Sequence, residues 1–163
     1  MIYTVMTKKA IKLMYEIHKE QVDKAGMPYV LHPLHVAEEM KDETSTIVAL
    51  LHDVVEDSNI TFDKLSELGF STNVIESLKL LTHNENDDYF DYIKKIATNP
   101  ISTSVKLADL KHNSDLTRID KITDNDILRT KKYKKCIKFL EDVQSMKNEN
   151  CQTKSNNRST HIR

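Results

Sequence analysis

Apolar residues recur at three- and four-residue steps along most of the chain, which is the spacing of amphipathic helices. The first stripe covers about residues 7–21, and the turn residues Gly26 and Pro28 follow it. Because proline is favoured at the first position of a helix, Pro33 indicates the start of a second one. His32 would then lie just before that helix. The N-terminal part is thus predicted to form two helices joined by a turn.

Residues 47–51, followed by Val54 and Val55, are apolar on nearly every side, and this pattern predicts a central, buried helix. His52, Asp53, Glu56 and Asp57 lie at its end, and we expect them to close the same helix. An isolated charge costs several kcal/mol to bury even after relaxation. A cluster of ionisable groups attached to a buried helix therefore indicates a bound cation or a water-filled cleft.

The pattern predicts further helices downstream. Their expected spans are 61–69, with Thr61 as the N-terminal cap and Gly69 at the end, 73–81, 87–97, a helix that begins after Asn99-Pro100 and carries residues 105–113, and 126–143. We expect Phe90 to lie in the core. The last helix is expected to pack Leu128, Ile137 and Leu140 inward.

The chain is predicted to be all-α, a single helical bundle around one buried helix. With 163 residues, of which 39% are hydrophobic, it is long enough for one domain with a core, and its two glycines and three prolines favour helices over a turn-rich β fold. We place this domain at residues 1–146. The polar segment 147–163 has almost nothing to bury and is predicted to be a disordered tail.

Charge and cysteine usage narrow the classes of function. The net charge is −1 and the C-terminal segment is basic, so the preceding body is acidic, which argues against a dedicated nucleic-acid surface. We find neither a secretory signal nor an apolar stretch of about 20 residues, and expect no membrane partner. Cys136 and Cys151 lack a CxxC spacing, which predicts reduced thiols in a cytoplasmic protein.

The candidate chemistry lies in three segments that carry histidines and carboxylates. His32 lies in PYVLHP, His52 and Asp53 lie in ALLHDVVED, and Asp109 lies in VKLADLKHN. Two imidazoles and two carboxylates suit a borderline divalent metal such as Mn²⁺, Fe²⁺ or Zn²⁺ better than Ca²⁺. We interpret the four residues as ligands of one divalent metal, with manganese as the first choice, and this predicts metal-dependent hydrolysis.

Two further acids follow the His-Asp pair. On a helix, residues four apart share a face, so His52 would stand beside Glu56 and Asp53 beside Asp57. Glu56 and Asp57 would then be placed to orient or deprotonate the attacking water. Alternatively, they are ordinary acids at a helix end, where the negative end of the helix dipole disfavours them.

Five motifs together carry a family resemblance over about residues 7–120. They are HxxQ at 18–21, K-x-G at 24–26, PYVLHP at 28–33, LLHDVVED at 50–57 and KLADLKHN at 106–113. In these motifs the chain resembles the HD-domain hydrolases of the RelA/SpoT type, which remove the 3′-pyrophosphate of the alarmones ppGpp and pppGpp. The chain is similar to the small stand-alone hydrolases of this type, so synthesis of ppGpp is not expected.

The resemblance implies a role for each matching residue. It makes His32, His52, Asp53 and Asp109 the ligands of a metal that is usually Mn²⁺ in the family, and it makes Glu56 and Asp57 the pair that activates water. It also implies that Lys24 and Asn113 contact the substrate.

The chain departs from the family pattern at two places. Where these hydrolases usually have Arg-Lys, it has Asp23-Lys24, so an acid replaces an arginine that is expected near the guanine base. Where they usually read DRLHN, it reads DLKHN from Asp109 to Asn113, which moves a cation by one position.

The predicted function is hydrolysis of (p)ppGpp to GDP or GTP and pyrophosphate, in the stringent response. The expected partner is a small phosphorylated nucleotide. Two alternatives stay open: an HD-type phosphohydrolase for another small nucleotide, which Asp23 favours, and a non-catalytic sensor that binds metal and nucleotide without turnover. Retention of both Glu56 and Asp57 argues against the sensor.

For several other residues, both a role in the site and a purely structural role stay open. Lys106, Lys111, Arg118 and Lys121 could meet substrate phosphates or lie on a solvated surface. His18, Gln21 and His112 could support a metal ligand or only satisfy polar contacts. Tyr89 could stack on a base or lie in the core.

Overall fold

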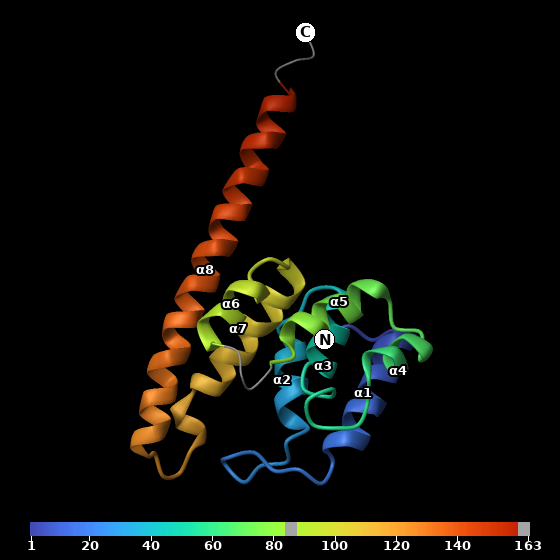
Figure 1. Ribbon diagram of the computed structural model, residues 1–163, viewed down its shortest axis with the longest axis vertical. Coiled ribbons are helices and arrows are strands. Elements are labelled where there is room, and N and C mark those ends of the chain that lie inside the picture. The colour runs from blue at the N-terminus through green and yellow to red at the C-terminus, as the bar shows by residue number, and fades with distance from the viewer. Residues whose placement is uncertain (84–87, 160–163) are drawn as a thin grey trace.

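The computed structural model of the chain describes residues 1–83 and 88–159, and the side chains up to residue 147 (Figure 1). Apart from one isolated bridge between Val22 and Pro28, these ranges contain only helices and loops. The helices are α1 (Val5–His18), α2 (Leu31–Glu38), α3 (Glu43–Leu51), α4 (Phe62–Glu67), α5 (Thr72–Leu81), α6 (Tyr89–Ile96), α7 (Pro100–Ser114), the short 3-10 helix η1 (Leu116–Arg118) and α8 (Asp124–Ser159). The predicted all-α class is confirmed.

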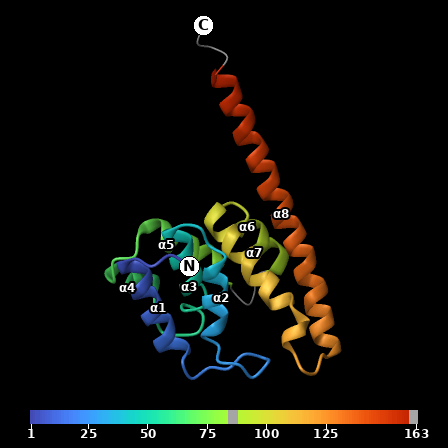
Figure 2. The same cartoon turned by 180° about the vertical axis from the view of Figure 1, so that it is seen from behind.

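Helix α3 is the centre of the bundle. Helices α1, α2, α5 and α7 all contact it, and every residue from Ser45 to Leu51 is buried. Asp42 caps its N-terminus, where the carboxylate accepts the backbone N–H of Ser45 at 2.9 Å. Views from the front and from behind both show α3 between α1 and α4 on one side and α6 and α7 on the other (Figure 2). The predicted central, buried helix is confirmed.

The ends of the first three helices differ from the prediction. Helix α1 ends at His18, because the chain turns there and Gln21 bonds back to the His18 ring at 2.7 Å. Helix α2 begins at Leu31, which places His32 in its first turn instead of before it. Helix α3 ends at Leu51, and the next residues form turns. The Nδ1 atom of His52 is hydrogen-bonded to the carbonyl oxygen of Ala49 at 2.7 Å. If the helix continued, this oxygen would instead accept the backbone N–H of Asp53.

The downstream helices begin close to their predicted starts. Thr61 caps α4, Asn99 caps α7, and Gly69 follows α4 with a φ of 86°. The predicted helix start at residue 87 lies outside the described residues, and α6 is capped by Asp88. Two core predictions are wrong. Phe90 is 41% exposed and packs against Phe139 on the surface, and Leu128 is 62% exposed at the start of α8. Leu140 is fully buried and Ile137 partly buried, as expected.

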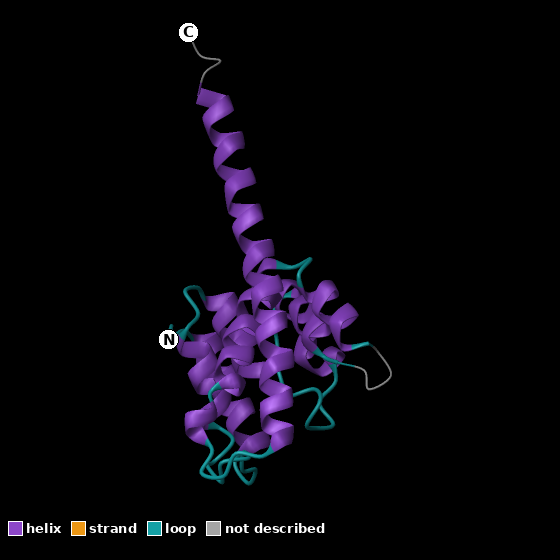
Figure 3. Cartoon of the chain, turned by 90° about the vertical axis from the view of Figure 1, so that its left-hand side faces the viewer, coloured by secondary structure: helices purple, strands orange, loops and turns teal. Residues whose placement is uncertain are grey.

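Helix α8 packs along α7 and then extends beyond the bundle (Figure 3). Its backbone is helical to Ser159. Residues 160–163 lie outside the described ranges, and both the boundary after residue 146 and the disordered tail stay predictions. Among the helices described, none combines the length and apolarity needed to cross a membrane.

Candidate metal centre

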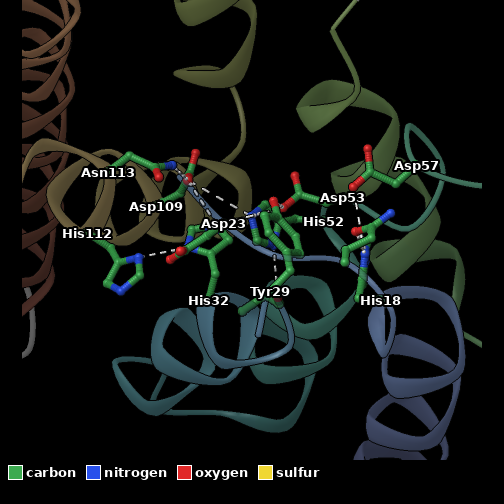
Figure 4. Close-up of polar contacts among 12 residues, drawn as sticks. His18, Asp23, Tyr29, His32, His52, Asp53, Asp57, Asp109, His112 and Asn113 are labelled. Carbon is green, nitrogen blue, oxygen red and sulfur yellow. Dashed lines mark hydrogen bonds and ion pairs between the residues drawn. The ribbon is translucent and has the colours of Figure 1, made fainter. Parts of the chain in front are cut away.

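Three buried residues from three helices meet at one point of the bundle. His32 comes from α2, His52 follows α3, and Asp109 comes from α7 (Figure 4). One ligand atom from each lies within 4.8 Å of the other two. The Nε2 atom of His32 is 3.3 Å from Nε2 of His52 and 3.3 Å from Oδ1 of Asp109. Two imidazole nitrogens and a carboxylate oxygen that converge in this way form a candidate site for a divalent metal.

Asp53, the fourth predicted metal ligand, lies beside the two histidines. Its Oδ2 atom is 3.0 Å from Nε2 of His52 and 3.7 Å from Nε2 of His32. The hydroxyl of Tyr29 donates to the same oxygen at 2.6 Å, which fixes the carboxylate against the cluster. The structure thus brings together the four residues that the sequence predicts as ligands. Tyr29 had no predicted role, although it lies in the PYVLHP motif.

The ring of His52 is held in the orientation that metal binding needs. Its Nδ1 atom lies 2.7 Å from the carbonyl oxygen of Ala49. A carbonyl can only accept, so Nδ1 carries a proton, and Nε2 faces the other ligands. A backbone carbonyl that accepts from the far nitrogen is one of the common ways in which proteins orient a metal-binding histidine.

The local charges also fit a cation. Burial by itself would raise the pKa of Asp109, but the ammonium of Lys106 at 2.8 Å and the two imidazoles hold the pKa well below its usual range. Burial would lower the pKa of His52, but the carboxylates of Asp53 and Asp109 outweigh it and raise the pKa to about 9. The cluster therefore keeps two ionised carboxylates and attracts positive charge, which a divalent metal would supply. The residues present fit such an ion.

The two predicted catalytic acids take different places. Glu56 lines the cavity that contains the ligands, and its carboxylate accepts the backbone N–H of His83 at 2.5 Å. Burial raises the pKa of Glu56, and this hydrogen bond opposes the rise. Asp57 lies 3.7 Å from the His18 ring and is not among the residues that line this cavity. The predicted helix does not continue through these residues, which follow α3 in turns, but His52 and Glu56 still line the same cavity.

Two adjoining cavities form a cleft at the cluster. One, of about 230 Å³, holds the four candidate ligands together with Glu56, Lys106, Tyr89 and Tyr92. The other, of about 310 Å³, is lined by Asp23, Lys24, Arg118 and Arg129. Tyr29, His32, Asn113 and Tyr133 line both cavities, so one ligand could occupy the two together.

The predicted substrate residues and several others lie along this cleft. Asn113 donates to Oδ1 of Asp109 at 2.5 Å, and Lys24 lines the larger cavity. Lys106 is a cavity residue and not a solvated surface charge, and its helical spacing from Asp109 could have shown this. Sequence reasoning missed the ion pair between Asp23 and Arg118, because the two residues are 95 positions apart and no local pattern connects them.

Comparison with known proteins finds relatives named as guanosine-3′,5′-bis(diphosphate) 3′-pyrophosphohydrolases and relatives named as GTP pyrophosphokinases. No protein-family model matches the chain. It is 29% identical over 148 residues to the guanosine-3′,5′-bis(diphosphate) 3′-pyrophosphohydrolase of Aquifex aeolicus (strain VF5), and this match covers 83% of the chain and 20% of that protein. It is 32% identical over 123 residues to the GTP pyrophosphokinase of Myxococcus xanthus, and this match covers 65% of the chain and 16% of that protein. The chain thus spans about a fifth or less of the length of these curated relatives.

The fold is also found in a solved structure of another protein. It belongs to a metazoan ortholog of SpoT that is described as hydrolysing ppGpp with a role in starvation responses, and it matches with a TM-score of 0.69 and 24% identity over 88% of this chain and 87% of that one. The predicted helical-bundle fold is therefore confirmed. The resemblance to the RelA/SpoT-type hydrolases is confirmed as well by the relatives in sequence.

Proposed function

We propose that the chain is a metal-dependent phosphohydrolase that removes the 3′-pyrophosphate of ppGpp and pppGpp. The observation that carries the proposal is the convergence of His32, His52 and Asp109, with Asp53 beside them, in a cavity that also holds Glu56. The Aquifex aeolicus relative, which is named for this reaction, adds support. The buried free thiol of Cys136 suits the cytoplasm, where we place the protein.

In this proposal the four residues of the cluster hold one divalent cation, for which we propose Mn²⁺. Nitrogen and oxygen ligands in equal number suit this metal, and the cation supplies Lewis acidity to the phosphate and to water. The carboxylate of Asp53 is kept in place by Tyr29, and that of Asp109 by Lys106 and Asn113. These contacts leave the ligand atoms fixed before the metal arrives.

Glu56 is the proposed general base. The oxygen of the attacking water forms a bond to the phosphorus that carries the 3′ oxygen, the bond from that phosphorus to the 3′ oxygen breaks, and the 3′ oxygen receives a proton. Glu56 holds the proton that the water loses, and burial favours this because it raises the pKa of the carboxyl. Asp57 is proposed to assist from beside His18.

The cations of the cleft are the proposed contacts for the nucleotide. Lys106 lies in the ligand cavity, and Lys24 and Arg129 line the adjoining one. Asn113 stands between the two cavities and would align the substrate with the ligands. A polyanion that enters an acidic cluster needs such positive groups around it.

A second candidate is hydrolysis of a different small nucleotide by the same machinery. It is favoured by Asp23, which brings a carboxylate into the larger cavity where the family resemblance leads us to expect an arginine. A panel of nucleoside di-, tri- and tetraphosphates would show which substrate is turned over.

The experiment that tests the proposal is release of pyrophosphate from ppGpp by protein loaded with Mn²⁺. We expect release that is lost in Asp53→Ala and kept in Lys111→Met, a change on the solvated side of α7, where Lys111 pairs with Glu141. A protein that binds Mn²⁺ and releases no pyrophosphate would contradict the assignment to ppGpp. Turnover of another nucleotide in the panel would then support the second candidate.

A further inference from the structure

The metal-facing residue His32 is connected to the larger cavity by a chain of polar contacts. The Nδ1 atom of His32 lies 2.8 Å from Nδ1 of His112, as the dashed line in Figure 4 shows. Nη1 of Arg118 lies 3.1 Å from the same Nδ1 of His112 and 3.3 Å from the His112 carbonyl oxygen. Nη2 of Arg118 pairs with Oδ2 of Asp23.

The guanidinium of Arg118 favours one direction for these contacts. It stays charged, and its Nη1 atom can donate to the carbonyl oxygen of His112, so its charge disfavours a proton on the adjacent Nδ1 of His112, which then acts as an acceptor. Two unprotonated ring nitrogens facing each other at 2.8 Å would repel, so Nδ1 of His32 donates to His112. A neutral imidazole has only one proton on its ring nitrogens. With the proton on Nδ1, the Nε2 atom of His32 has a free lone pair for a cation between His32, His52 and Asp109. Without a cation, the ionised carboxylate of Asp109, 3.3 Å from Nε2, competes for that proton.

We propose that Asp23, Arg118 and His112 form a positioning relay that keeps His32 in the tautomer that binds metal. The inference rests on one part of the proposed function, namely that His32 is a metal ligand. It assigns a role to the acid at position 23 that differs from recognition of a base. The three residues act through His32 and need not touch the substrate.

Asp23 is suited to hold the far end of the relay. Its Oδ1 atom accepts the backbone N–H of Ala25 at 2.8 Å and that of Met27 at 3.0 Å, which closes the loop before α2. Its Oδ2 atom accepts a hydrogen bond from Nη2 of Arg118. Asp23 is only 13% exposed and Arg118 28%, so the pair is partly withdrawn from water. With both oxygens used inside the protein, Asp23 orients the guanidinium and leaves it little freedom to leave His112.

The first test uses the unaltered protein with Zn²⁺ bound, because this ion is diamagnetic and binds imidazole nitrogen. Nitrogen-15 chemical shifts of the imidazoles, measured on histidine-labelled protein, distinguish a protonated from an unprotonated ring nitrogen. We expect the proton of His32 on Nδ1 and that of His112 on Nε2. A proton on Nδ1 of His112 would overturn the relay, whatever the protein hydrolyses.

The second test measures the affinity for Mn²⁺ by electron paramagnetic resonance. Arg118→Met removes the donor and lets His112 take a proton on Nδ1, so we expect the affinity to fall by roughly tenfold or more, the usual effect of losing a group that orients a ligand. Lys111→Met is the matched control, because it removes one charge from the neighbouring helix end without touching His112. Equal affinities in the two variants would overturn the relay.

Variants of His112 separate positioning from simple packing. His112→Asn keeps an acceptor near the place of Nδ1 and is expected to retain most of the Mn²⁺ affinity, whereas His112→Phe keeps the ring but no acceptor and is expected to lose it. Equal loss in both would contradict the relay. Failure of the proposed function would give a different result. The protein would then bind Mn²⁺ and show the expected tautomers, but it would release no pyrophosphate from ppGpp.

Discussion

Lys106 and Asp109 form a buried ion pair one turn apart on α7, with 2.8 Å between Nζ and Oδ2. The other carboxylate oxygen of Asp109 faces the imidazoles at 3.3 Å and 4.0 Å. The Asp109 carboxylate thus contacts the Lys106 ammonium with one oxygen and faces the proposed metal site with the other. The buried charge of Asp109 is compensated on one side by Lys106 and is available to a ligand on the other.

Replacing Lys106 by methionine should therefore destabilise the metal-free protein more than the metal-loaded one. Removal of one partner from a buried ion pair leaves an uncompensated charge and costs about 3 kcal/mol or more. A divalent cation would compensate Asp109 from its other oxygen, so the loss in free energy of unfolding should shrink in Mn²⁺. Urea unfolding with and without Mn²⁺ measures this difference.

Lys111→Met is the control for that comparison. Lys111 pairs with Glu141 at 2.8 Å, but both side chains are about half exposed, and such pairs are worth less than about 1 kcal/mol. A loss for Lys106→Met that stays the same with and without Mn²⁺ would mean that the metal does not contact Asp109.

Metal affinity should rise with pH, because His52 must lose a proton before it can bind. Burial lowers the pKa of His52, but the nearby carboxylates of Asp53 and Asp109 raise it to about 9, above the ordinary value of about 6.5. The stabilisation from this proton in the metal-free protein is fully present below the ordinary pKa and is lost as the pH rises through about 9. The apparent affinity for Mn²⁺ should thus increase about tenfold per pH unit between these values.

Calorimetry in two buffers with different ionisation enthalpies checks that prediction, since it counts the protons released on binding. We expect close to one proton at pH 7.5. Binding without proton release at that pH would show that the His52 proton is absent from the metal-free protein.

Asp23→Arg should weaken the site instead of restoring a family-like pocket. The new guanidinium would face Arg118, and the loop would lose the acceptor for the amides of Ala25 and Met27. We expect a loss of about 1–3 kcal/mol in the free energy of unfolding, as for a buried hydrogen bond left without its partner, and a lower affinity for Mn²⁺. Thermal unfolding and Mn²⁺ titration measure the two effects.

The charge-swapped double variant, Asp23→Arg with Arg118→Asp, sharpens this test. It restores an ion pair but places an acceptor beside Nδ1 of His112, so stability should recover in part while the affinity for Mn²⁺ does not. Rapid turnover of ppGpp by Asp23→Arg alone would instead show that position 23 reads the base and that the pair with Arg118 is dispensable.

The sequence predicts those parts of the molecule that depend on local patterns or on short motifs. The continuous apolar run of α3 predicts a buried helix, and the caps Thr61 and Asn99 predict where α4 and α7 begin. The turns after α3 were not predicted, because they depend on the hydrogen bond between the His52 ring and the carbonyl oxygen of Ala49, which replaces a backbone hydrogen bond of the helix. The contact between Asp23 and Arg118 depends on how distant segments pack, which no local period encodes.

Side chains at the edge of the bundle are the other weak point. Leu128 is 62% exposed although Asp126 and Thr130 beside it are buried. Nine residues separate Leu128 from Ile137, which places the two on opposite faces of α8. The apolar character of Leu128 is thus not enough to place it inside, because the buried face at this level of the helix carries polar residues.

Glu56→Gln is expected to separate catalysis from metal binding. Glu56 lines the ligand cavity but is bonded to the backbone N–H of His83, so the amide should leave the ligands in place and the affinity for Mn²⁺ nearly unchanged. Loss of the general base should lower kcat by about 10² to 10⁴, with little change in KM. Asp57→Asn is the matched variant: Asp57 is 37% exposed and faces His18, so we expect a smaller fall in kcat. Steady-state kinetics on ppGpp compare the two, and a larger loss in Asp57→Asn would transfer the role of base to that residue.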